Sequence, residues 1–269
     1  MDQVGAFLRE YGALALAVIA LAQPWVVVTW RKLFRPGAIE IYETGTIEIG
    51  YSGFGPTIGL VGTLRARDRE LFVRAASIEI EREADHARHG FEWAAFRTTR
   101  NIIGRPIETS FSVPVGFMLT PTQPNRYNIF FNDLKFQQER LVPIAQPLQA
   151  AWLAAVAAAL GGPANNANAT AAQVAQAVTA TYPGFQNSNP HVHAVTRIGQ
   201  EFYWAAGWYR LTLKIQTARP DLAFERSWRF QLTDAHSQTL RRNCQKIAQE
   251  VCGQNVGQYE FASAQYHQG

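Results

Sequence analysis

The sequence has few of the residues that build reactive sites through short motifs. It contains only two cysteines, Cys244 and Cys252. They lie on one predicted helix, about 12 Å apart along its axis, so they cannot form a disulfide with each other there. Neither cysteine has the neighbours of a nucleophilic thiol, and no G-x-S-x-G motif is present. Two unpaired thiols indicate a reducing compartment.

The sequence also lacks a phosphate-binding loop, although the stretch from Gly50 to Gly62 holds five glycines. A dinucleotide loop needs G-x-G-x-x-G before a helix, whereas here the last gap is longer and a strand-like run follows. A Walker loop needs Lys and then Ser or Thr after its last glycine, and these do not follow Gly62. We therefore predict a turn at Gly53 and Gly55, and a bulge or a close approach of another element at Gly59 and Gly62. No cofactor is expected.

Charge of one sign is not concentrated anywhere in the chain. The net charge is +4, charged residues make up 17 % and apolar residues 47 % of the sequence. Basic and acidic residues alternate, as in residues 65–70 (RARDRE), whereas nucleic-acid binders gather basic charge on one face. The composition excludes a disordered chain and disfavours a nucleic-acid partner. The length, 269 residues, fits one large domain or two small ones.

The most informative segment is an uncharged run from Tyr11 to Trp30. About twenty residues at roughly 1.5 Å each span a hydrocarbon core of about 30 Å. Aromatic residues lie near its ends, and Arg31, Lys32 and Arg35 follow it. The run predicts a single transmembrane helix within an N-terminal anchor, residues 1–35. The basic residues after it predict that the C-terminal domain, residues 36–269, is cytoplasmic.

Two other interpretations of this run remain open. Ala20-Leu-Ala22 fits the cleavage site of a signal peptide, but the basic region that precedes such a segment is missing. A buried core helix is the second alternative, because the first half is rich in Ala and Pro24 interrupts the run.

The body of the chain shows the alternating pattern of β-strands. Residues 39–49 predict a hairpin that turns at 43–45, and residues 209–215 and 224–232 predict a second pair joined by a turn at 218–221. Other candidate strands are 57–66, 71–81, 91–98, 107–115 and 127–131. Many short strands separated by Gly and Pro turns indicate a sandwich or a barrel. We expect a mainly β, β-sandwich-like domain.

Residues 207–213 (GWYRLTL) resemble the penultimate strand of immunoglobulin-like sandwiches. The resemblance is generic and covers a small part of the chain. It implies an immunoglobulin-like sandwich as one form of the fold, and it implies no activity.

An α-helical insertion is expected at about residues 134–185. Residues 148–160 form an Ala-rich helix, too short to span a membrane, and Thr170 caps a second helix that ends at Pro183. A C-terminal helix is predicted from about Asp234 to Cys252. The Gln- and Ser-rich tail after Gly253 is expected to be loosely ordered.

Candidate sites for chemistry are sparse. His191 and His193 would share a face of an extended segment and could hold a metal with a third ligand. His86 and His89 form a second pair in what resembles a solvated hairpin loop. The aromatic residues 202–209 fit a core better than a sugar or base site. We therefore assign no metal and no catalytic residue.

These observations favour a membrane-anchored binding or scaffold protein that acts through its cytoplasmic domain. The alternative is an anchored enzyme of the hydrolase type, with a site between the sandwich and the helical insertion. Small side chains in the insertion allow close approach of another helix. We predict that Trp152, Val156 and Leu160 contact a protein partner or a second copy of the chain, as a homo-oligomer.

Overall fold

The computed structural model describes residues 20–27, 29, 37–100, 108–162, 169–219 and 223–268. The strands are β1 (Ala38–Ser52), β2 (Gly55–Arg67), β3 (Leu71–Arg82), β4 (Arg88–Arg100), β5 (Glu108–Ser112), β6 (Phe117–Leu119), β7 (Asn125–Asn132), β8 (Gly207–Thr217), β9 (Ala223–Leu232) and β10 (Phe261–Gln268). The helices are α2 (Leu134–Phe136), the π-helical turn η1 (Gln137–Leu141), α3 (Val142–Ala159), α5 (Ala171–Phe185), α6 (Asn189–Gln200) and α7 (Asp234–Val251).

Among the described residues, eight antiparallel strands close into a barrel. Their order is β4-β7-β2-β1-β10-β9-β8-β3, and the pairing of β3 with β4 closes the circle. The short strand β5 pairs with the last residues of β4, from Phe96 to Arg100. The short strand β6 pairs with the first residues of β3, from Leu71 to Val73. The prediction of a mainly β body is confirmed. A β-sandwich is not found, because one sheet closes on itself where a sandwich would pack two sheets face to face.

Side chains fill the interior of the barrel. Alternate residues of β3 and β8, such as Ile78, Ile80, Leu211 and Leu213, point inward and are buried. The internal void between Leu60, Leu213 and their neighbours is about 10 Å³, room for one water at most. Eight strands leave an interior that side chains can fill. The barrel is therefore a packed core, and a ligand site must lie outside it.

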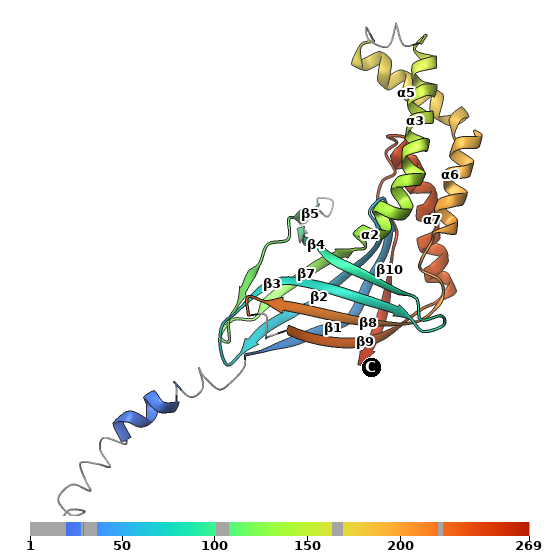
Figure 1. The fold of residues 1–269 in the computed structure, drawn as a ribbon. Coiled ribbons are helices and arrows are strands. Elements are labelled where there is room, and N and C mark those ends of the chain that lie inside the picture. Colours follow the sequence, from blue (N-terminus) through green and yellow to red (C-terminus); the bar gives the residue numbers. More distant parts are fainter. Residues whose placement is uncertain are drawn as a thin grey trace, which may run out of the picture.

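Helices cover one end of the barrel and extend away from it (Figure 1). Helix α7 packs on β1 and β10 through a buried stripe that includes Leu240, Cys244 and Ile247. The buried Trp204 lies at the same end and donates from Nε1 to the carbonyl oxygen of Gly50 at 2.8 Å. Helices α3, α5 and α6 pack on one another and form an arm. We refer to this end as the helical end.

Several local predictions are confirmed. The strands around 57–66, 71–81, 91–98 and 127–131 exist, and β8 and β9 bury the predicted faces. Helix α7 has almost the predicted limits. Thr170 caps α5 through a capping box, although α5 continues through Pro183 to Phe185. Gly53 lies in the β1–β2 turn, as expected.

Four local predictions are wrong. Residues 39–49 form one strand, because Gly45 at φ 79° accommodates a bulge in β1 instead of a turn. The tail contains β10, whose inward residues Ala262 and Ala264 are too small to produce a strong hydrophobic pattern. His191 and His193 lie in a helix, α6, which lengthens the helical segment between β7 and β8 to Gln200. The first Ala-rich helix starts earlier than predicted, at Val142.

Most of the predicted membrane span lies outside the described residues. Residues 20–27 and 29 are described and helical, and Leu21 and Trp25 are exposed. Within the described part of the chain, the continuous helix Leu134–Ala159 is long and apolar enough to cross a membrane by length and composition alone. Core helices of soluble proteins meet the same criteria, and 28 % of its most apolar window is buried.

Candidate functional site

A pocket of about 670 Å³ lies outside the barrel, between its wall and the start of the helical segment. We name it the β4–α2 pocket. Strands β3, β4 and β8 form one side, and residues 133–140 form the other. Its lining consists of Ser77, Ile78, Glu79, Arg88, His89, Gly90, Phe91, Glu92, Asp133, Lys135, Phe136, Glu139, Arg140 and Lys214. The volume falls in the range of small-molecule sites, about 300–1,000 Å³.

Gly90 leaves the barrel side of this pocket hollow. It pairs with Glu79 across β3 and β4, and a Cβ atom at this position would meet no atom within 4 Å. The next residue, Phe91, points into the barrel and stacks on Trp204. A residue without a side chain at this outward position of β4 therefore leaves room for the pocket.

A π-helical turn forms the other side. Pro143 has no amide hydrogen for a bond to the carbonyl of Glu139 four residues earlier. The chain forms the π-turn η1 just before it, where the Val142 amide bonds the Gln137 carbonyl. Glu139 and Arg140 belong to this turn and line the pocket. Single π-turns within helices occur frequently at functional sites.

A histidine and a carboxylate meet at the base of this helical turn. Asp133 follows β7, and its Oδ1 accepts the Phe136 amide at 2.8 Å, which caps α2. Its Oδ2 lies 3.0 Å from Nδ1 of His89, on the neighbouring strand β4. The Asp133 side chain is 5 % exposed, and the His89 side chain is 26 % exposed. The Tyr203 ring packs against the imidazole, with 4.0 Å between the two ring centroids.

This geometry fixes the orientation of the imidazole. When the buried carboxylate accepts from Nδ1–H, the lone pair is on Nε2, as in histidines that act as bases or ligands. Among the described residues, no hydroxyl or thiol hydrogen-bonds to His89. The pair can therefore accept a proton from a ligand or from water, but it has no adjacent protein nucleophile in the described chain.

The pocket presents charges of both signs. Lys214 forms an ion pair with Glu79 at 2.8 Å, and this hydrogen bond raises the pKa of Lys214. In contrast, Lys135, Glu92 and Glu139 form no ion pair with any described residue. A pocket that combines paired and unpaired charges is complementary to a polar ligand that carries both signs.

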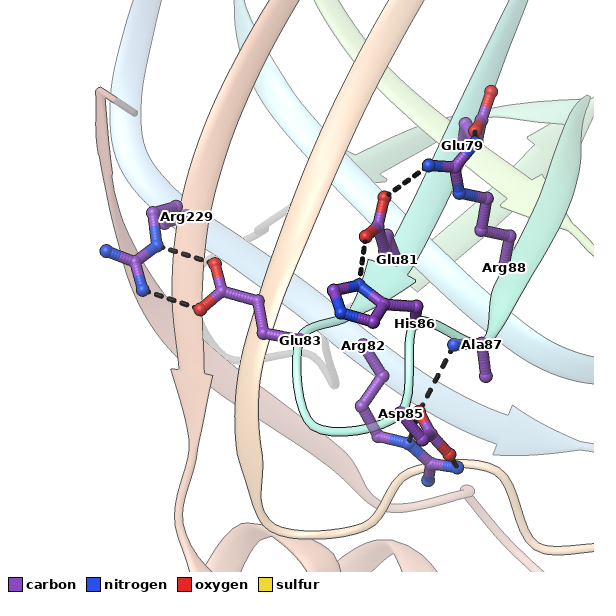
Figure 2. Close-up of polar contacts among 9 residues, drawn as sticks. All are labelled: Glu79, Glu81, Arg82, Glu83, Asp85, His86, Ala87, Arg88 and Arg229. Atoms are coloured by element: carbon purple, nitrogen blue, oxygen red, sulfur yellow. Dashed lines mark hydrogen bonds and ion pairs between the residues drawn. The ribbon is translucent and has the colours of Figure 1, made fainter.

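Ion pairs hold the β3–β4 hairpin at the edge of the pocket (Figure 2). Glu81 lies between His86 at 2.8 Å and Arg88 at 3.0 Å. Arg82 binds Asp85 through two hydrogen bonds of 2.9 and 2.6 Å. These contacts fix the strand segment that carries Arg88 and His89 into the lining.

Another ion pair ties this hairpin to strand β9. Arg229 donates to both carboxylate oxygens of Glu83, at 2.7 and 2.6 Å. The β3–β4 hairpin is therefore held by ion pairs within itself and by this ion pair to β9.

The predicted partner-binding residues lie elsewhere, in the arm. Trp152 and Val156 are buried there, and Trp152 packs against Tyr182 and Phe185, while Leu160 is half-buried at the end of α3. These contacts belong to the interior of the arm. A partner contact through the three residues stays a prediction.

The two histidine pairs do not form chelates. In α6, His191 is buried next to the Tyr182 hydroxyl and burial lowers its pKa, whereas His193 is exposed. His86 contacts Glu81, and His89 contacts Asp133. No group of three or more His, Cys, Asp or Glu residues in the described part of the chain could hold a metal ion.

The cysteines and the aromatic cluster, apart from the exposed Trp208, belong to the core. Cys244 and Cys252 are buried, and burial raises the pKa of each thiol to about 11, so both are protonated at neutral pH. Phe202, Tyr203 and Trp204 are buried under the helices, as expected of core residues.

Comparison with known proteins gives no relative. No protein-family model, curated protein or solved structure matches the chain. The function must therefore be inferred from the site itself.

Sequence reasoning missed the β4–α2 pocket because its parts are distant in the chain. Asp133 and His89 are separated by 44 residues. One local signal was available: an aspartate directly after an alternating strand, three residues before the buried Phe136, is a helix N-cap pattern. That pattern identifies the cap but not its histidine partner.

Proposed function

We propose that the protein is a single-pass membrane-anchored binding protein whose cytoplasmic domain holds a small polar ligand in the β4–α2 pocket. The observation that supports this proposal is the convergence of three features in one place. A void of small-molecule size, a π-turn and the His89–Asp133 pair share the same lining. Pockets with convergent polar groups are the usual location of binding sites.

The charges of the lining favour one class of ligand. Lys135 supplies an unpaired positive charge, and Glu92 and Glu139 supply negative ones. All three side chains are exposed, and a ligand with only one kind of charge would pair with some of them and be repelled by the others. We therefore expect a zwitterion, such as an amino acid or a short peptide.

Membrane anchoring is supported by the sequence. The run from Tyr11 to Trp30 carries no charge, and Arg31, Lys32 and Arg35 follow it. A binding domain held at the cytoplasmic face would sample its ligand close to the bilayer.

Ligand-observed NMR with three sets of small molecules tests the binding proposal. The sets are neutral polyols, compounds of one charge sign, and amino acids with dipeptides. The zwitterionic set should bind to the purified full chain. Gly90→Phe should abolish that binding without unfolding the protein, because a Cβ atom at this position meets no atom within 4 Å and the added ring would extend into the pocket.

A matched control uses another glycine with free space. Gly184 lies exposed in α5, away from the pocket, and Gly184→Phe should bind like the wild type. If no zwitterion binds, or if Gly90→Phe binds as well as the wild type does, the proposal is wrong.

A hydrolase is the second candidate, and the His89–Asp133 pair is the observation that favours it. A carboxylate-oriented imidazole is a typical general base, which here would activate water. The wild-type protein would then hydrolyse p-nitrophenyl acetate, and His89→Asn would lose this activity while retaining ligand binding. Equal rates for the two proteins would exclude the enzyme interpretation.

A further inference from the structure

The end of the barrel opposite the helices has a distinct surface. There the chain enters β1 at Ala38, which pairs with Arg67 at the end of β2. The β2–β3 turn, strand β6 and the β8–β9 turn meet at the same end, since Leu71 pairs with Leu119 and Val73 with Thr217. In Figure 1 this end lies to the left of the barrel, away from the arm. We name it the basic end.

Apolar side chains gather on the outside of the basic end. Phe72 and Met118 pair across β3 and β6 and are 39 % and 49 % exposed. The Phe72 ring also lies directly on the backbone of Gly116, beside Val115, which is 62 % exposed. An exposed patch of neighbouring apolar side chains marks an interaction surface.

Arginines surround this patch. Arg74 follows Phe72 on the outward face of β3, and Arg219 lies in the β8–β9 turn, where the Ala218 amide donates to the Phe72 carbonyl oxygen at 2.9 Å. Neither guanidinium forms an ion pair with a described residue. In the β2–β3 turn, Asp68 and Glu70 balance the charges of Arg67 and Arg69, so the excess positive charge of this end comes from Arg74 and Arg219.

The length of the chain before β1 limits how far this end can lie from the predicted span. Six residues lie between Trp30 and Gly37, and the seven steps from one Cα atom to the next reach at most about 25 Å when fully extended. Three of the residues in between are basic: Arg31, Lys32 and Arg35. Of the two barrel ends, the basic end is therefore the one held close to the bilayer.

We propose that the basic end lies against the surface of a bilayer that contains anionic lipids. Phe72, Val115 and Met118 enter the headgroup region, and Arg74 and Arg219 contact lipid phosphates. This inference rests on the proposed membrane anchor. It also fixes the orientation of the barrel relative to the bilayer, because Asp133 and the helical side of the β4–α2 pocket then face away from the membrane.

Site-specific fluorescence tests the contact. Met118→Cys in the full chain is labelled with the environment-sensitive fluorophore NBD and reconstituted into vesicles that contain doxyl-labelled lipid. The native Cys244 and Cys252 are buried, so the label attaches at the introduced thiol. Phe54→Cys is the matched control, because Phe54 is 61 % exposed in the β1–β2 turn at the helical end.

In vesicles of phosphatidylcholine with phosphatidylglycerol, the doxyl lipid should quench the label at position 118 and leave the label at position 54 unquenched. Raising the salt from about 0.1 M to 1 M shortens the Debye length from about 10 Å to 3 Å and should reduce the quenching. Arg74→Glu combined with Arg219→Glu should reduce it at low salt as well.

Two failures are distinguishable by whether the protein sediments with the vesicles. If the chain sediments with them and the label at position 118 is not quenched, the surface contact is wrong and the anchor stands. If the chain does not sediment with them, both the anchor and this inference are wrong. Equal quenching in pure phosphatidylcholine would overturn the role of anionic lipid.

Discussion

Two glycines, Gly62 and Gly90, show how a single residue can allow close packing at one position and leave open space at another. A Cβ atom at Gly62 would lie 2.5 Å from the Tyr127 hydroxyl and 2.8 Å from the Tyr42 carbonyl oxygen. A Cβ atom at Gly90 would meet nothing within 4 Å. The first glycine allows two strands and a tyrosine ring to pack together, and the second creates the β4–α2 pocket.

Alanine at these two positions should therefore have opposite effects. Gly62→Ala should lower the free energy of unfolding by about 1–3 kcal/mol, the typical cost of an overpacked core. Gly90→Ala should leave it unchanged or raise it by up to about 1 kcal/mol, because alanine loses less backbone entropy than glycine on folding. Urea denaturation of both variants measures the difference. Equal stabilities would contradict the assigned packing around Gly62.

The sequence predicts some of these residue roles and not others. The close approach at Gly62 follows from a glycine inside an apolar alternating strand, and the structure confirms it. The hollow at Gly90 has no such signal, because it depends on the helical turn that packs opposite. The His89–Asp133 contact is likewise a product of strand order, since β4 and β7 become neighbours only in the closed sheet.

At the scale of elements, the β3–β4 hairpin carries several ion pairs and positions one side of the pocket. The hydrogen bond from Arg82, together with the Ala87 amide, holds the pKa of Asp85 at about 2, below its usual value near 4. The folded state therefore favours the ionised carboxylate. Its contribution to stability is complete above pH 4 and is lost as the pH falls through about 2.

Asp85→Asn tests this contribution. The variant should have a lower Tm than the wild type at pH 7, and the difference should disappear as the pH falls from 4 to 2. Glu70→Gln, in an exposed turn at the other end of the barrel, should show no such pH-dependent difference. Thermal unfolding followed by circular dichroism provides the comparison, and a Tm difference that persists at pH 2 would show that Asp85 acts through something other than its charge.

The local hydrophobic pattern predicts a strand or a helix well where the buried face of that element consists of large apolar side chains. The alternation in β8 and β9 and the stripe of α7 are such cases. Prediction fails where the buried side chains are small, as in β10, or where a glycine bulge mimics a turn, as in β1. The polar helix α6 was missed because its buried face contains only His191, Ala194 and Ile198.

At the scale of the whole molecule, closure of the sheet decides the architecture. The same short strands fit a sandwich or a barrel, and the choice depends on whether β3 pairs with β4 while β4 also pairs with β7. These are long-range pairings that local periodicity does not encode. Closure fills the interior with side chains and moves the candidate site to the outside of the wall. It also separates the two ends, so that one carries the helices and the other the arginines near the predicted anchor.

The central claim is that a zwitterionic ligand occupies the β4–α2 pocket, and the imidazole NMR signals of the protein test it most directly. The sequence has only six histidines, so the His89 signal can be assigned with a His89→Gln variant. Titration with the amino acids and dipeptides that bind should move the His89 signal. The signals of His193 in the arm and His236 in α7, both away from the pocket lining, should stay in place. A titration that moves the signals of His193 or His236 and leaves that of His89 unchanged would contradict the account.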